Sequence, residues 1–153
     1  MPGLQRLLIP CVTVLLALAA TAAQAGLGNP VAQLRDDQSR LGARDISVQR
    51  AAAFDRHAFQ SSNGVRIRAF AGRDGQVFAV TFDGPAMPDL KVLLGTRYAE
   101  YASAVRPSPS THKVYTYASG TLELNIVKLP RGFTGSAWVP GAVPAGVNVS
   151  ALQ

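Results

Sequence analysis

The 153-residue sequence contains few of the residues on which most catalytic and metal chemistry depends. It has one cysteine, Cys11, and two histidines, His57 and His112. A single cysteine excludes a disulfide framework within the chain and a zinc site built on several cysteines. Acidic residues are also few: nine stand against fifteen lysines and arginines, which gives a net charge of +6. The sequence therefore predicts a basic protein without disulfides, cofactor or metal.

The longest apolar run lies at the N-terminus and predicts a cleaved signal peptide over residues 1–25. Arg6 supplies the positive charge, residues 7–20 form the apolar part, and Ala23-Gln24-Ala25 matches a cleavage site. The run is short for a bilayer-spanning helix of about 20 residues. Cleavage would leave a chain that begins at Gly26, has no cysteine and carries a charge of +5, because Arg6 is the only charged residue removed. We expect export to the periplasm or the medium, and no stable membrane span after cleavage.

Residues 26–153 are predicted to form a single α+β domain. A helix is expected from Asn29-Pro30 to Gly42, because Asn caps helices and Pro is tolerated in their first turn. The turn dipeptides Asn63-Gly64 and Asp74-Gly75 separate alternating segments and predict an antiparallel meander. The predicted fold is an N-terminal helix and an antiparallel sheet of about five or six strands, with a helical insertion in its middle. The expected strands are 54–60, 65–70, 76–82, 113–118, 121–129 and 133–139, with the insertion at 88–106.

The segment from Gly75 to Gly95 reads GQVFAVTFDGPAMPDLKVLLG. It resembles the hallmark of the domain of unknown function 2844 family, small exported proteins of Gram-negative proteobacteria. Tyr98 and Tyr101 match the aromatic helix that follows the motif, and residues 133–140 and 144–147 are similar to the closing segment. The linker at 106–112 is shorter than is usual in the family. The resemblance covers most of residues 27–150. It implies that the protein is exported, but it implies no activity. The matching motif residues are Gly75, Val77, Phe78, Ala79, Val80, Gly84, Pro85, Pro88, Asp89, Leu90, Leu93, Leu94 and Gly95.

No complete catalytic or metal-binding motif is present. There is no G-x-S-x-G nucleophile elbow and no His or Asp spacing typical of zinc or calcium sites. A hydrolase-like site would have to combine His57 with the loop of residues 84–89, whose last residue is Asp89. The simpler interpretation of Asp89 is that it caps or charges the start of a helix. We favour a non-enzymatic protein and name no catalytic residue.

Arg66 and Arg68 share one face of a predicted strand and indicate an anionic partner. Nucleic acid is not expected, because no recognition motif accompanies the arginines and an exported chain does not meet the nucleoid. An envelope protein or an anionic cell-surface component such as lipopolysaccharide fits better. The candidate binding residues are His57, Arg66, Arg68 and Asp89. The sequence thus predicts an envelope binding module, with a hydrolase-like enzyme or a cystatin-like inhibitor or carrier as alternatives.

Overall fold

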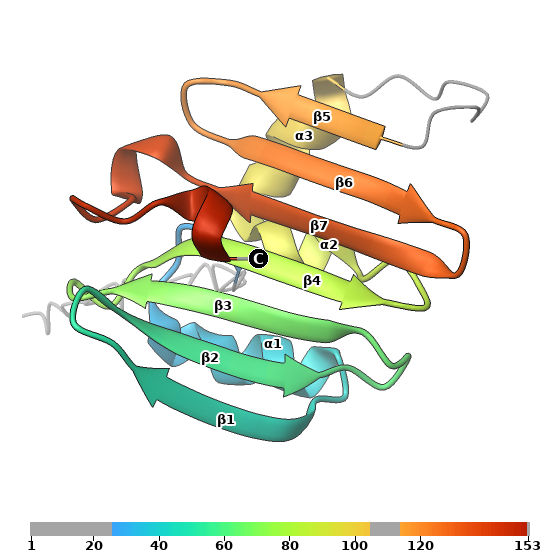
Figure 1. Ribbon diagram of the computed structural model, residues 1–153, viewed down its shortest axis with the longest axis horizontal. Helices are drawn as coiled ribbons and strands as arrows, with labels where there is room; N and C mark the ends of the chain where they lie inside the picture. Colours follow the sequence, from blue (N-terminus) through green and yellow to red (C-terminus); the bar gives the residue numbers. More distant parts are fainter. Residues whose placement is uncertain (1–25, 105–113, 153) are drawn as a thin grey trace, which may run out of the picture.

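Seven strands form one antiparallel sheet in the order β1-β2-β3-β4-β7-β6-β5 (Figure 1). The computed structural model describes residues 26–104 and 114–152, so the predicted signal peptide at 1–25 and the Pro- and Ser-rich loop at 107–110 lie outside the described residues. The strands are β1 (Arg44–Arg50), β2 (Phe54–Gln60), β3 (Arg66–Gly72), β4 (Val77–Gly84), β5 (Val114–Ala118), β6 (Glu123–Leu129) and β7 (Gly132–Trp138). The α+β class is as predicted.

The prediction of five or six strands was wrong because it missed β1. All seven residues of β1 are exposed, so the strand has no buried stripe to mark it in the sequence. Its pairing with β2 is also irregular between Arg44 and Ser47, where Asp45 has a positive φ of 53°. This irregularity interrupts the two-residue alternation by which strands are recognised.

The N-terminal segment differs from the predicted helix over Asn29 to Gly42. Its first part pairs with the start of β4: the Gly28 amide donates to Val77 O at 2.8 Å, and Pro30 forms an isolated bridge with Gln76. Only then do a 3₁₀ turn, η1 (Val31–Gln33), and a short helix, α1 (Leu34–Arg40), follow. The backbone of residues 28–30 therefore pairs with the sheet and does not form a helix.

The helical insertion between β4 and β5 has three pieces. These are α2 (Leu90–Leu94), η2 (Gly95–Arg97) and α3 (Tyr98–Ala104). Gly95 has a φ of +53°, which glycine adopts at little cost and which separates α2 from the following helical turns. All the helices of the described chain except those at the C-terminus lie behind the sheet in Figure 1.

The sheet buries side chains on both faces. The face that carries α1, α2 and α3, here the helix face, holds the larger core. The opposite face, here the open face, is partly covered by a C-terminal segment of residues 139–152, which contains η3 (Pro140–Ala142) and η4 (Val149–Leu152) (Figure 1). The smaller core under this segment includes Phe70, Phe78 and Ala79, against which Val147 and Leu152 pack.

A β-bulge in β4 supplies that smaller core. Phe70 and Ala71 of β3 pair with Ala79 and Val77, so Phe78 is an extra residue in β4. Phe78 and Ala79 consequently face the same side, whereas strict alternation would separate them. β4 is buried on both faces, as its continuous apolar sequence indicates.

Candidate functional site

Strand alternation places the predicted binding residues on two different faces of the sheet. Arg66 and Arg68 flank Ile67 on β3, and Ile67 belongs to the core on the helix face. Both arginines therefore lie on the open face. His57 of β2 pairs in register with Ala69, another residue of the helix-face core. The structure thus brings the two arginines together and puts His57 on the other side.

One carboxylate, Asp83 of β4, is shared by both arginines. Arg66 donates to Asp83 Oδ2 from Nε at 2.9 Å and from Nη2 at 2.6 Å. Arg68 donates from Nη1 to Asp83 Oδ1 at 3.0 Å. Arg66 is 67% exposed, and a solvent-exposed pair of this kind contributes only about 0–1 kcal/mol to stability. Asp83 therefore orients the two guanidinium groups and leaves a net positive charge.

Arg56 of β2 is a third arginine on this face, and the sequence analysis missed it. Arg56 pairs in register with Phe70 of the open-face core, and its Nη2 donates to the side-chain oxygen of Gln49. Among the described residues Arg56 has no carboxylate partner. The alternation along β2 could have identified its face, but its proximity to Arg68 depends on the β2–β3 register. We call Arg56, Arg66 and Arg68 the arginine face.

Two hollows adjoin on the arginine face and share Arg68. The larger has a volume of about 380 Å³ and lies between the end of the C-terminal segment and strands β1–β3. The smaller, of about 210 Å³, lies over β2 and β3 and includes Arg66. The larger volume is at the lower end of the range for ligand pockets, about 300–1,000 Å³. Its lining residues are Gln49, Arg50, Ala51, Phe54, Arg56, Arg68, Phe70, Ala151 and Leu152.

Asp89 has a capping role in the structure. Its Oδ1 accepts hydrogen bonds from the backbone N–H groups of Lys91 at 2.9 Å and Val92 at 3.3 Å, which makes it the N-cap of α2. Burial lowers the pKa of His57, and the neighbouring Asp55 partly offsets that effect. Within residues 26–104 and 114–152, no hydrogen bond or ion pair joins His57 to Asp89. The same residues contain no group of three or more His, Cys, Asp or Glu placed to hold a metal.

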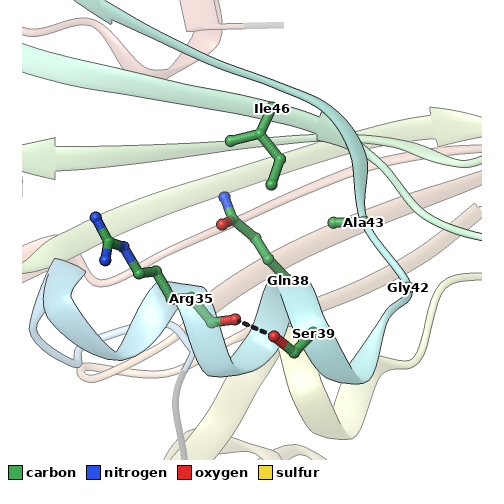
Figure 2. Close-up of a pocket in the computed structure, with 6 residues that line it drawn as sticks. All are labelled: Arg35, Gln38, Ser39, Gly42, Ala43 and Ile46. Atoms are coloured by element: carbon green, nitrogen blue, oxygen red, sulfur yellow. Dashed lines mark hydrogen bonds between the residues drawn. The ribbon is translucent and has the colours of Figure 1, made fainter.

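A further cavity of about 530 Å³ lies between α1 and β1 (Figure 2). We call it the α1–β1 groove. It is lined by Arg35, Gln38 and Ser39 from α1, by Gly42 and Ala43 from the turn, and by Ile46 from β1. Figure 2 shows the Ile46 side chain pointing from the strand toward the Gln38 amide. Neither this groove nor β1 was predicted from the sequence, although Ile46 and Val48, two positions apart, were a signal for a strand.

The motif from Gly75 to Gly95 forms structure rather than a surface site. Val77, Phe78 and Val80 are buried in the central strand β4, and Leu93 and Leu94 are buried under it. Gly84 approaches the residue before β3 so closely that an added Cβ would lie 2.7 Å from Val65 Cα. The motif therefore specifies the packing of β4 against the helical insertion.

The fold and the motif together define the class of protein: an α+β protein built on one seven-stranded antiparallel sheet with its α-helices on one face. The chain belongs to the family described as Protein of unknown function (DUF2844), whose family model matches residues 23–152. This match confirms the resemblance carried by the Gly75–Gly95 motif. Comparisons with curated proteins and with solved structures gave no significant match. In the described part of the chain, no helix is both long and apolar enough to cross a membrane.

Proposed function

We propose that the protein is exported and acts in the periplasm or medium as a non-enzymatic binding module for an anionic component of the cell envelope. The observation that carries this proposal is the arginine face, where Arg66 and Arg68 share the single carboxylate of Asp83 and Arg56 has no carboxylate partner among the described residues. The predicted signal peptide supports the compartment. The two hollows beside these arginines support the binding role.

The chemistry of the arginine face suits a carboxylate or phosphate. Guanidinium groups present several donors in a planar fork and bind such groups with two parallel hydrogen bonds. Arg56 donates only to a neutral amide, so its charge is uncompensated by any described residue. Arg66 and Arg68 share one counterion, so the face attracts anions and would lose that attraction as salt screens it. An acidic envelope polysaccharide or lipopolysaccharide is the ligand class we favour.

Binding of purified lipopolysaccharide to the exported protein, measured by titration calorimetry, tests the proposal. The double variant Arg56→Gln and Arg66→Gln is expected to weaken binding by about tenfold or more, since each removed charge contact contributes about 1 kcal/mol. Lys91→Gln is the matched control, because Lys91 is an exposed cation on α2 at the helix face. Equal affinity of the double variant and the wild type would refute the role of this face.

Cell fractionation tests the compartment separately. We expect the processed chain in the periplasm or the medium, beginning at Gly26 by mass spectrometry. Retention of the full-length chain in the cytoplasm would reject the exported role. The protein could instead bind an acidic envelope protein through the same arginines and show no affinity for lipopolysaccharide. That result would replace the proposed ligand class, while the proposed binding surface would stand.

A further inference from the structure

β1 is an edge strand, which leaves one row of its backbone groups unpaired. It is hydrogen-bonded to β2 alone, as the first strand in the sheet order. In such a strand, alternate residues direct their N–H and C=O groups away from the sheet, where they can pair with another chain. Ile46 and Val48 are 55% and 51% exposed on this strand. Two of the four exposed large hydrophobic residues of the described chain thus lie on one open edge.

The α1–β1 groove lies beside this edge and contains a polar group without a partner. Gln38 is only 7% exposed, and its side-chain amide makes no hydrogen bond to any described residue. Figure 2 shows that amide directed from α1 into the groove, toward Ile46. Its atoms are not among the buried side-chain atoms that lack a partner in the described residues, so the amide still reaches water in the groove. An incoming chain could supply the missing hydrogen bond and cover Ile46 at the same time.

The charges around the edge select the kind of partner. Arg44 and Arg50 end the strand and Arg35 lines the groove, and none of the three forms an ion pair within the described residues. A second copy of the chain would bring four arginines and only two aspartates to the seam. Complementary charge therefore favours an acidic partner over self-association.

We propose that β1 accepts an extended, acidic segment of another protein as an additional strand of the sheet. Alternate apolar side chains of that segment would cover Ile46 and Val48, and its acidic groups would meet the arginines. An alternative explanation is that charged residues on an edge strand merely prevent unwanted pairing with other strands. That purpose explains the arginines, but it does not explain the two half-exposed aliphatic residues or the groove beside them, into which the Gln38 amide points. The proposal rests on the backbone edge of β1 and on the α1–β1 groove, whereas the arginine face lies on the open side of the sheet, where Gln49 and Arg50 of β1 also line the larger hollow.

The probe is a peptide of the same seven-residue length as β1, which alternates valine with threonine and carries glutamate at both ends. We expect it to shift the backbone amide resonances of residues 44–50 in the NMR spectrum of the full mature protein. The same peptide with lysine ends should bind about tenfold more weakly. A peptide methylated on alternate backbone nitrogens cannot donate to a strand and should not bind.

Variants locate the interaction on the protein. Ile46→Asp and Gln38→Leu are expected to weaken binding of the glutamate peptide, whereas Val114→Asp, at the opposite edge of the sheet and equally exposed at 52%, should not. Arg35→Glu with Arg50→Glu should reverse the preference and favour the lysine peptide. Arg56→Gln with Arg66→Gln should leave peptide binding unchanged, which separates this proposal from the proposed function.

Three outcomes would overturn the inference. The first is the absence of any shift at residues 44–50 with the glutamate peptide. The second is equal affinity for the glutamate and lysine peptides. The third is concentration-dependent dimerisation that Ile46→Asp abolishes, because the edge would then pair with a second copy of this chain.

Discussion

At the scale of single residues, Asp37 is the most unusual group of the helix-face core. It lies on α1, is 2% exposed, and its Oδ1 has no hydrogen-bond partner among the described residues. Burial raises the pKa of this carboxyl group from 3.8 to about 7, while Arg40 opposes the shift and Asp36 adds to it. The folded protein therefore holds a proton that the unfolded chain gives up at lower pH.

We predict that folding stability falls as the pH rises from about 4 to about 7. In that window the folded state binds more protons than the unfolded state, so raising the pH favours unfolding. Asp37→Asn keeps the shape and removes the titration. It should flatten this part of the stability profile and raise the melting temperature at pH 8. Thermal unfolding followed by circular dichroism between pH 4 and pH 8 measures both effects.

Asp36→Asn is the control for this prediction, since Asp36 is the exposed neighbour on the same helix. It should leave most of the pH dependence in place. A profile of Asp37→Asn that falls as steeply as the wild-type profile would contradict the assignment of the titration to Asp37.

At the scale of elements, Glu100 connects α3 to the turn between β5 and β6. Its carboxylate accepts hydrogen bonds from the hydroxyl groups of Ser119, Thr121 and Tyr117, which hold its pKa below the ordinary value of 4.5. Ser119 Oγ in turn accepts from the backbone N–H of Leu122 at 3.0 Å. The contribution of this network is therefore present at neutral pH and is lost on strong acidification.

Glu100→Ala should loosen that turn without unfolding the sheet. We expect faster hydrogen exchange at the amides of Thr121 and Leu122, both of which donate to Ser119 Oγ. The measurement is exchange followed by NMR at neutral pH. Glu123→Ala on the same hairpin is the control and should leave those two amides unchanged. Unaltered exchange in Glu100→Ala would show that the turn holds its shape alone.

Strands of the same sheet are expected to differ sharply in their contribution to stability. Ile67 of β3 is 0% exposed and Ile46 of β1 is 55% exposed, so Ile→Ala at the two sites is a matched pair. Ile67→Ala should cost about 2–5 kcal/mol of unfolding free energy, because it removes buried methyl groups and leaves a cavity. Ile46→Ala should stay within about 0.5 kcal/mol. Urea unfolding measures both, and similar losses would mean that β1 is covered in solution.

The difference between buried and exposed strands also explains which elements could be predicted from the sequence. Strands β2 to β7 were recognisable because each has an alternating or continuous apolar pattern next to a turn residue. β1 lacks a buried face, so the two-residue spacing of Ile46 and Val48 is the only strand signal that it carries. The segment before α1 has helix-start residues, Asn29 and Pro30, yet it pairs with β4, since tertiary hydrogen bonding outweighs a local capping preference.

At the scale of the whole molecule, the sheet is stabilised from both sides. Val147 and Leu152 pack on the open-face aromatic cluster of Phe54, Phe70 and Phe78, whose rings lie 5.6–6.4 Å apart between centroids. Removal of residues 145–153 should expose this cluster and lower the melting temperature, with increased binding of a hydrophobic dye. Removal of Gln153 alone is the control. An unchanged melting temperature would show that the helix-face core suffices.

The candidate site was predictable only where it depended on one strand. Arg66 and Arg68 share a face of β3, and alternation alone establishes that. The nearness of Arg56, the shared counterion Asp83 and the burial of Gln38 each depend on a register or a packing contact between segments distant in sequence. His57 and Asp89 are the opposite case. Their side chains suit a hydrolase-like site and were combined on that ground, but His57 lies on β2 and Asp89 is the N-cap of α2.

Gly26 would connect the folding of the protein to its processing if the proposed signal peptide is cleaved after Ala25. It is buried, and an added Cβ would lie 2.6 Å from both Val92 O and Gly95 N at the end of α2. A protease requires an accessible, extended chain on both sides of the bond that it cuts. If the leader is removed before Gly26, cleavage should precede the docking of this residue onto α2. Delayed processing would then delay the docking of this residue onto the end of α2.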